Sequence, residues 1–128
     1  MTDRITRSIS ASTPDGLSST VSDFVDVEVV EKIEATAVKS SVPLIVLVHP
    51  ATVAVQFIAI TAERYDDLTM AVGLGSPITL DGPLELMNEG LVALLGEDTS
   101  TITFTNADAT EDNDITILVG RSAVAPGA

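Results

Sequence analysis

Residues 25–37, VDVEVVEKIEATA, indicate the fold class because their apolar side chains recur at every second position. The apolar odd positions are Val25, Val27, Val29, Ile33, Ala35 and Ala37, with Glu31 as the exception. The even positions carry mostly polar or charged side chains: Asp26, Glu28, Lys32, Glu34 and Thr36. A period of two is typical of a β-strand with one solvated face. A helix over residues 29–39 is the alternative, because Glu and Lys favour helices.

The rest of the chain repeats short β-prone segments separated by Gly, Pro, Asn and Asp clusters. We expect further strands within residues 42–48, 53–61, 68–74, 78–80, 84–86, 91–95, 101–105 and 115–119. This spacing is typical of an antiparallel sandwich or barrel, and no helical period is long enough for a βαβ crossover. The prediction is therefore an all-β protein, an antiparallel β-sandwich or barrel of about eight short strands with an extended N-terminal arm.

We divide the chain into three parts. Residues 1–23 are rich in Ser, Thr and Asp around the turn signal Pro14-Asp15-Gly16, and predict a flexible or extended arm. Such an arm is either a disordered tail or a segment that orders against a neighbouring subunit. Residues 24–123 are the expected β-sandwich domain, and residues 124–128 a short tail.

The composition indicates a small aliphatic core that gains from association. The 128 residues are 45% hydrophobic but only 3% aromatic, and cysteine is absent. The core is therefore built from Val, Ile, Leu and Ala, without disulfides or thiolate metal sites. Because a thin aliphatic core leaves stability to be gained from a partner, we expect a homo-oligomer.

The charge limits the class of partner. Nineteen acidic and six basic residues give a net charge of −13, which repels phosphate backbones and anionic lipid headgroups. We therefore expect no binding to nucleic acid or membranes. The acidity fits either adaptation to high salt or docking on a basic surface. The longest apolar run, residues 42–48, is too short to span a bilayer, and the polar N-terminus resembles no signal peptide. We expect synthesis in a cytoplasm.

Few side chains suggest chemistry, and each has a simple structural interpretation. His49 is the only histidine, beside Pro50, and we interpret it as a turn residue because no second ligand or nucleophile accompanies it. The densest acidic cluster is Asp108, Glu111, Asp112 and Asp114. It predicts a solvated turn, with a calcium site as the alternative, although the EF-hand spacing is missing. The sequence around Gly73 and Gly75 lacks the lysine of a phosphate loop. We expect no enzyme, catalytic residue, cofactor or metal.

The C-terminal half carries a resemblance to known proteins. Residues 76–123 contain a proline-bounded Leu-x-Leu strand, a short apolar strand, and Thr- and Ile-rich strands that end in Ile-Leu-Val-Gly-Arg. This pattern resembles small structural proteins of tailed bacteriophages, among them the head decoration or cement proteins. The resemblance implies a β-sandwich or barrel that forms trimers and clamps neighbouring capsomers. The polar arm is similar to the extensions by which such proteins reach an adjacent subunit, and no catalytic residue is implied.

These expectations combine into one functional hypothesis. The chain is a virion structural accessory protein, a capsid decoration or cement protein that binds the major capsid protein or another virion protein and stabilises the assembled shell. Its place is the virion, after assembly in the host cytoplasm. The alternatives are a tail or neck component of the same particle, or a β module that binds calcium or carbohydrate through residues 108–114.

Overall fold

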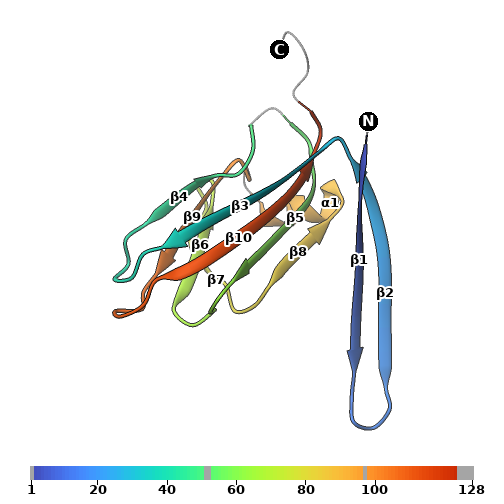
Figure 1. The fold of residues 1–128 in the computed structure, drawn as a ribbon, viewed down its shortest axis with the longest axis horizontal. Coiled ribbons are helices and arrows are strands. Elements are labelled where there is room, and N and C mark those ends of the chain that lie inside the picture. Colours follow the sequence, from blue (N-terminus) through green and yellow to red (C-terminus); the bar gives the residue numbers. More distant parts are fainter. Residues whose placement is uncertain (1, 51–52, 97, 124–128) are drawn as a thin grey trace.

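The computed structural model describes residues 2–50, 53–96 and 98–123, and its strands form three antiparallel sheets (Figure 1). The first sheet, the hairpin, pairs β1 (Asp3–Ser12) with β2 (Ser18–Val27). Sheet I has the order β3 (Val29–Ala37), β10 (Asn113–Arg121), β5 (Val55–Ala62) and β8 (Leu84–Met87). Sheet II has the order β4 (Leu44–Leu47), β9 (Thr101–Asn106), β6 (Leu68–Val72) and β7 (Ile78–Thr79).

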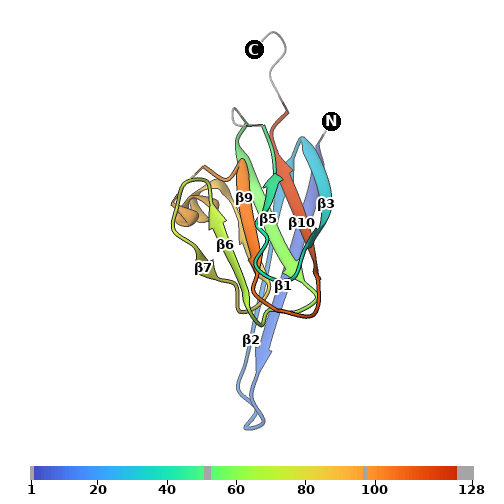
Figure 2. The same cartoon turned by 90° about the vertical axis from the view of Figure 1, so that its left-hand side faces the viewer.

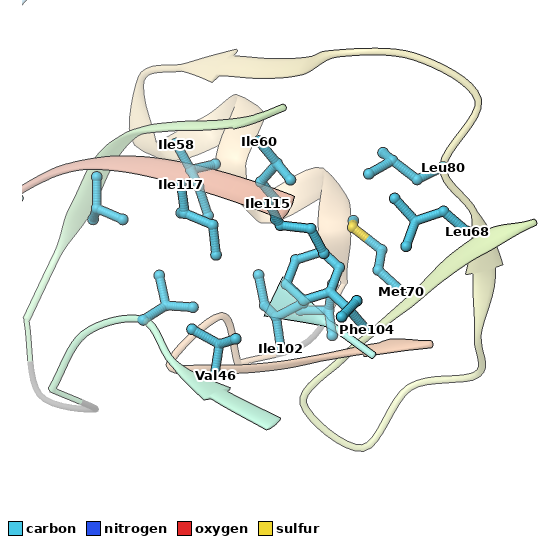
Figure 3. Packing of buried hydrophobic residues seen from close by; sticks show 14 of the residues in the cluster. Val46, Ile58, Ile60, Leu68, Met70, Leu80, Ile102, Phe104, Ile115 and Ile117 are labelled. Atoms are coloured by element: carbon cyan, nitrogen blue, oxygen red, sulfur yellow. The ribbon is translucent and has the colours of Figure 1, made fainter. Parts of the chain in front are cut away.

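Sheets I and II pack face to face, which confirms the predicted all-β antiparallel sandwich. The described strands do not close into a barrel, so that part of the prediction is excluded. The core between the sheets is almost wholly aliphatic, as expected from the composition. Figure 3 shows Phe104 as the single aromatic ring among the labelled core residues, packed with Ile102, Ile115 and Met70. These residues occupy alternate strand positions, so every second residue remains for the outer faces.

The period-two stretch forms strands, and the helix considered for residues 29–39 does not form. Ile33, Ala35 and Ala37 face the core while the even positions of β3 are exposed, as the alternation predicted. The stretch is divided at Glu28, whose N–H donates to the carbonyl of Arg121. Val25 and Val27 therefore belong to the hairpin, and only the remainder joins sheet I. Alternation cannot locate such a break because both strands have the same period.

The prediction of a strand over residues 91–95 is wrong. This segment forms one helical turn, α1 (Glu89–Val92), followed by the 3-10 turn η1 (Ala93–Leu95), which ends at Gly96 with φ 79°. A short apolar run does not distinguish a strand from a helix by periodicity, and the preceding Asn88 and Glu89 suit a helix start. Val92 is buried against the core, whereas Leu91 and Leu94 are exposed.

The segment expected as an arm forms a regular hairpin. Its two strands pair from Asp3 with Val27 to Ser12 with Ser18, around a turn at Thr13 to Leu17 that includes Pro14-Asp15-Gly16. The boundary drawn at residue 23 falls inside β2, and the tail drawn at residues 124–128 lies outside the described residues. Within the described segments, no helix is long and apolar enough to cross a membrane.

The hairpin and sheet II lie on opposite sides of sheet I. Figure 1 shows sheet II, sheet I and the hairpin in succession from left to right, and Figure 2 shows sheet II in front with the hairpin behind. In both views the tip of the hairpin extends beyond the end of the sandwich. The hairpin therefore cannot cover the outer face of sheet II in its own chain.

Candidate interaction surfaces

The hairpin is an amphipathic ribbon. Its register puts Ser8 opposite Ser22, Ser10 opposite Thr20 and Ser12 opposite Ser18, so one face of its distal half carries only hydroxyl groups. The opposite face carries Ile5 with Val25 and Ile9 with Val21. We call the second one the aliphatic face of the hairpin. An isolated two-stranded ribbon is only marginally stable in water, so this face needs an apolar contact.

At the root of the hairpin, that contact is the outer face of sheet I. Val27, Phe57 and Met87 are almost fully buried, yet they do not belong to the core between the sheets. Gly120 lies beneath the hairpin, because a Cβ atom built on it would be 2.6 Å from Ile5 Cδ1 and 3.0 Å from Val27 Cγ1. The absent side chain lets the hairpin approach sheet I closely. We call these five residues the root cluster.

An ion pair borders the root cluster. The guanidinium of Arg7 lies 3.7 Å from an Asp23 carboxylate oxygen in the hairpin and 3.6 Å from a Glu85 carboxylate oxygen of sheet I. Arg7 is largely buried while both carboxylates are more exposed. These long contacts orient the hairpin more than they stabilise it, because ion pairs near solvent are weak. The root is therefore fixed by apolar packing with a charged border.

Beyond the root, the hairpin has no contact that buries it. Every residue from 8 to 22 is exposed, including Ile9, Val21 and Leu17 on the aliphatic face and at the turn. Asp15 is the only charged residue in this segment. We call residues 8–22 the distal hairpin. The distal hairpin continues the aliphatic face that is buried at the root, but here this face is exposed to solvent.

The outer face of sheet II is the second uncharged surface. Its outward positions alternate with the buried core residues, and all of them are uncharged: Ile45, Leu47, Thr69, Ala71, Thr79, Thr101, Thr103 and Thr105. Ile45 and Leu47 are strongly exposed on the edge strand β4, and Leu74 is 99% exposed in the turn that follows β6. Large exposed aliphatic side chains gathered on a flat sheet are typical of protein contact sites. We call this surface the threonine face.

The acidic loop does not bring its carboxylates together. Asp108 accepts hydrogen bonds from the N–H groups of Thr110 and Glu111 and from the Thr110 hydroxyl, which together hold the pKa of Asp108 below its ordinary value. The other three bind separate partners: Glu111 pairs with Arg64, Asp112 accepts from the Lys39 N–H, and Asp114 accepts from the Thr36 hydroxyl. In the part of the chain that the structure describes, no three His, Asp or Glu side chains are arranged to hold a metal ion.

Two buried asparagines that we did not single out from the sequence hold this loop in place. Asn106 donates to the carbonyls of Ala37 and Glu111 and accepts from the Asp108 N–H. Asn113 makes hydrogen bonds with both the N–H and the carbonyl of Arg64. Both are almost fully buried, so their amides replace water for the turn backbone. Only their position at the ends of two strands could have suggested this role.

His49 lies in a buried hydrogen-bonded position. Its Nδ1 is 2.6 Å from the carbonyl oxygen of Pro50, which can only accept, so Nδ1 carries the proton. Its Nε2 is 2.7 Å from the hydroxyl of Thr99. A cavity of about 240 Å³ beside it is also lined by Glu89 and Asp98. Both ring nitrogens are therefore engaged by the fold.

Two further segments, the acidic residues 63–67 and the glycine-rich residues 73–75, also lie in turns. In the turn that contains Glu63, Asp66 and Asp67, the hydroxyl oxygen of Tyr65 accepts a hydrogen bond from the N–H of Ala62. Gly73 has φ 54° after the end of β6, and the Gly75 N–H donates to the Val72 carbonyl. Left-handed backbone at Gly73 suits a tight turn that presents Leu74 to solvent.

Comparison with known proteins adds no relative: no family model, curated protein or solved structure matches the chain. The two uncharged surfaces therefore have to be interpreted from their own chemistry. From the sequence, residues 1–23 were a candidate for contact with a neighbouring subunit, without individual contact residues. The structure shows Ile9, Val21 and Leu17 exposed on the hairpin, and Ile45 and Leu47 exposed on the threonine face.

Proposed function

We propose that the protein is a structural component that works by adhesion, as a capsid decoration or cement protein of a tailed bacteriophage. The distal hairpin and the threonine face make its contacts with other protein surfaces. In this role it binds the assembled shell and stabilises it by mass action, since a ligand that binds only one state favours that state. It performs no catalysis and needs no cofactor.

One observation carries this proposal. A molecule with a net charge of −13 keeps two extended surfaces free of charge apart from Asp15, and exposes large aliphatic side chains on both. Single exposed apolar residues are normal on a protein surface, whereas large ones gathered on one face mark a contact site. Depletion of charge together with exposed apolar groups is the composition of the centre of a protein interface. The phage setting rests on the resemblance of residues 76–123.

The experiment is co-sedimentation with purified empty heads of a tailed phage whose genome encodes this chain. We expect the added protein to sediment with the heads and to raise the temperature at which they break open. A variant with Leu47→Glu, on the threonine face, should bind less than one with Leu94→Glu. Leu94 is a matched control because it is 74% exposed and Leu47 is 75% exposed.

Two other results would change the proposal. Binding to purified tails but not to heads would place the protein in the tail or neck of the particle. Failure to sediment with heads, tails or whole particles would overturn the virion role altogether.

A further inference from the structure

Among residues 2–50, 53–96 and 98–123, no surface of the same chain covers the aliphatic face of the distal hairpin. The root of the same face is buried on sheet I, whereas Ile9 and Val21 are about half exposed, at 49% and 51%. The tip extends past the end of the sandwich, and the threonine face lies on the far side of sheet I. An intramolecular contact between the distal hairpin and the threonine face is therefore excluded by the fold.

The two surfaces match each other chemically. Both are flat β surfaces that combine aliphatic side chains with Ser or Thr hydroxyls, and face-to-face packing is the common way for two such surfaces to bury their side chains. Leu17, Ile9 and Val21 on one surface correspond in kind to Ile45 and Leu47 on the other. Apart from Asp15 at the hairpin turn, neither surface offers a charge for a basic partner to recognise.

Electrostatics favour a second copy as the occupant. Two molecules with a charge of −13 repel each other wherever their carboxylates approach. Close association is favoured through surfaces with few carboxylates. The distal hairpin, with Asp15 as its only charged residue, and the threonine face both meet this condition. A basic partner would instead be matched by the acidic loops around Asp66, Asp67 and Asp112.

We infer that the distal hairpin of one copy docks on the threonine face of another copy. This inference rests on the adhesive role proposed above for both surfaces. It names a second copy of the chain as their partner, so in a closed ring the shell is contacted through the remaining surface of the assembly. Because the two surfaces differ, the contact is heterologous. Repeating it gives a closed ring if the rotation that relates neighbouring copies brings the last copy back to the first. Each chain then makes two contacts, one with its hairpin and one with its threonine face.

The size of the contact supports a closed assembly. With a rise of about 3.4 Å per residue and strands about 4.8 Å apart, the distal hairpin covers about 24 Å by about 10 Å of a flat surface. One such contact buries about 480 Å² on the two partners together, which is below the roughly 1,000 Å² of a lasting interface. Two contacts per chain approach that value, so a ring is more stable than an open pair.

The absence of cysteine allows a direct test by crosslinking. Val21→Cys puts a single thiol on the aliphatic face of the hairpin, and Leu47→Cys puts one on the threonine face of a different chain. The two variants are mixed, treated with a short bis-maleimide crosslinker, and compared with each variant alone. We expect several-fold more crosslinked dimer in the mixture than with either variant by itself.

Two controls make the result decisive. Leu94→Cys replaces Leu47→Cys as a thiol of equal exposure away from the threonine face, and Thr20→Cys replaces Val21→Cys on the hydroxyl face of the same hairpin. Both control mixtures should give little dimer. Thermal melting of every variant checks that it is folded, which is expected because all four positions are exposed.

The outcomes separate this inference from the proposed function. Equal crosslinking in the test and control mixtures, or a monomer by light scattering at high micromolar concentration, would overturn docking between copies. Dimer from Val21→Cys alone would show a hairpin-to-hairpin contact and would also overturn it. A monomer that still sediments with phage heads would leave the proposed function intact while the inference fails.

Discussion

Asp108 shows how a single carboxylate can fix a loop without forming a site. Its oxygen accepts three hydrogen bonds from Thr110 and Glu111, and these bonds lower its pKa in the folded protein. A group with a lowered folded-state pKa stabilises the fold above its unfolded pKa, which is about 3.9 for Asp. This stability is lost as the pH falls through the lower, folded-state pKa.

We therefore predict that Asp108→Ala lowers the melting temperature at neutral pH but has a smaller effect under strongly acidic conditions. Thermal melts measured from neutral pH down to below the folded-state pKa check this. Asp108→Asn is the control, because its amide oxygen still accepts the hydrogen bonds but does not titrate. A difference between Asp108→Ala and the unmodified protein that is the same at every pH would contradict the prediction.

For single residues, the sequence indicated which side chains are polar but not which partners they contact. It identified the acidic cluster from Asp108 to Asp114 as a solvated turn or a calcium site. Which partner each carboxylate finds depends on residues more than forty positions away, such as Arg64 and Lys39. The buried positions of Asn106 and Asn113 could not be predicted from the sequence either, because Asn is also favoured in exposed turns.

The hairpin is the element whose position depends most on one residue. Gly120 leaves room for Ile5 and Val27, and an added Cβ would also lie 3.3 Å from Phe57 Cβ. We predict that Gly120→Ala displaces the hairpin root and destabilises its docking by about 1–3 kcal/mol, the usual cost of overpacking. Gly120→Val should separate the hairpin from sheet I altogether, because its larger side chain cannot be accommodated by moving the Ile5 terminal methyl.

Hydrogen exchange measured by peptide is the appropriate readout. Protection should fall in residues 3–27 and remain in β9 and β10, since the sandwich core does not include the root cluster. Gly82→Ala is the control, because nothing lies within 4 Å of a Cβ at that position. Unchanged protection of the hairpin in Gly120→Val would show that the root cluster does not hold it.

Elements differ in how far the sequence predicted them. The alternation in β3 and β10 was clear because one face of each strand is buried in the core. The hairpin also alternates, but Ser and Thr fill the distal half of one face and Arg7 and Asp23 interrupt the other, so a pattern based on apolar residues missed it. The helical turns at α1 and η1 were missed because five apolar residues in a short run, residues 91–95, suit either structure.

The whole molecule combines a strong net charge with two surfaces that are free of charge apart from Asp15. Composition alone predicted an oligomer and an acidic surface, but it could not show that the charge is distributed unevenly. That distribution depends on which strand faces point outward, and therefore on the pairing of β4, β9, β6 and β7. The fold was thus largely predictable, whereas the contact surfaces required the register of the sheets.

The uneven charge predicts the sign of the response to salt. The Debye length falls from about 10 Å at 0.1 M salt to about 3 Å at 1 M, so repulsion between acidic copies weakens. Association through the distal hairpin and the threonine face should therefore strengthen with potassium chloride, and the melting temperature should rise as self-repulsion within each copy is screened. Sedimentation equilibrium and thermal melts at both salt concentrations measure these effects, with sorbitol at equal osmolarity as the uncharged control. Association that weakens as salt increases would instead show that copies meet through opposite charges, and the uncharged surfaces would then have no part in it.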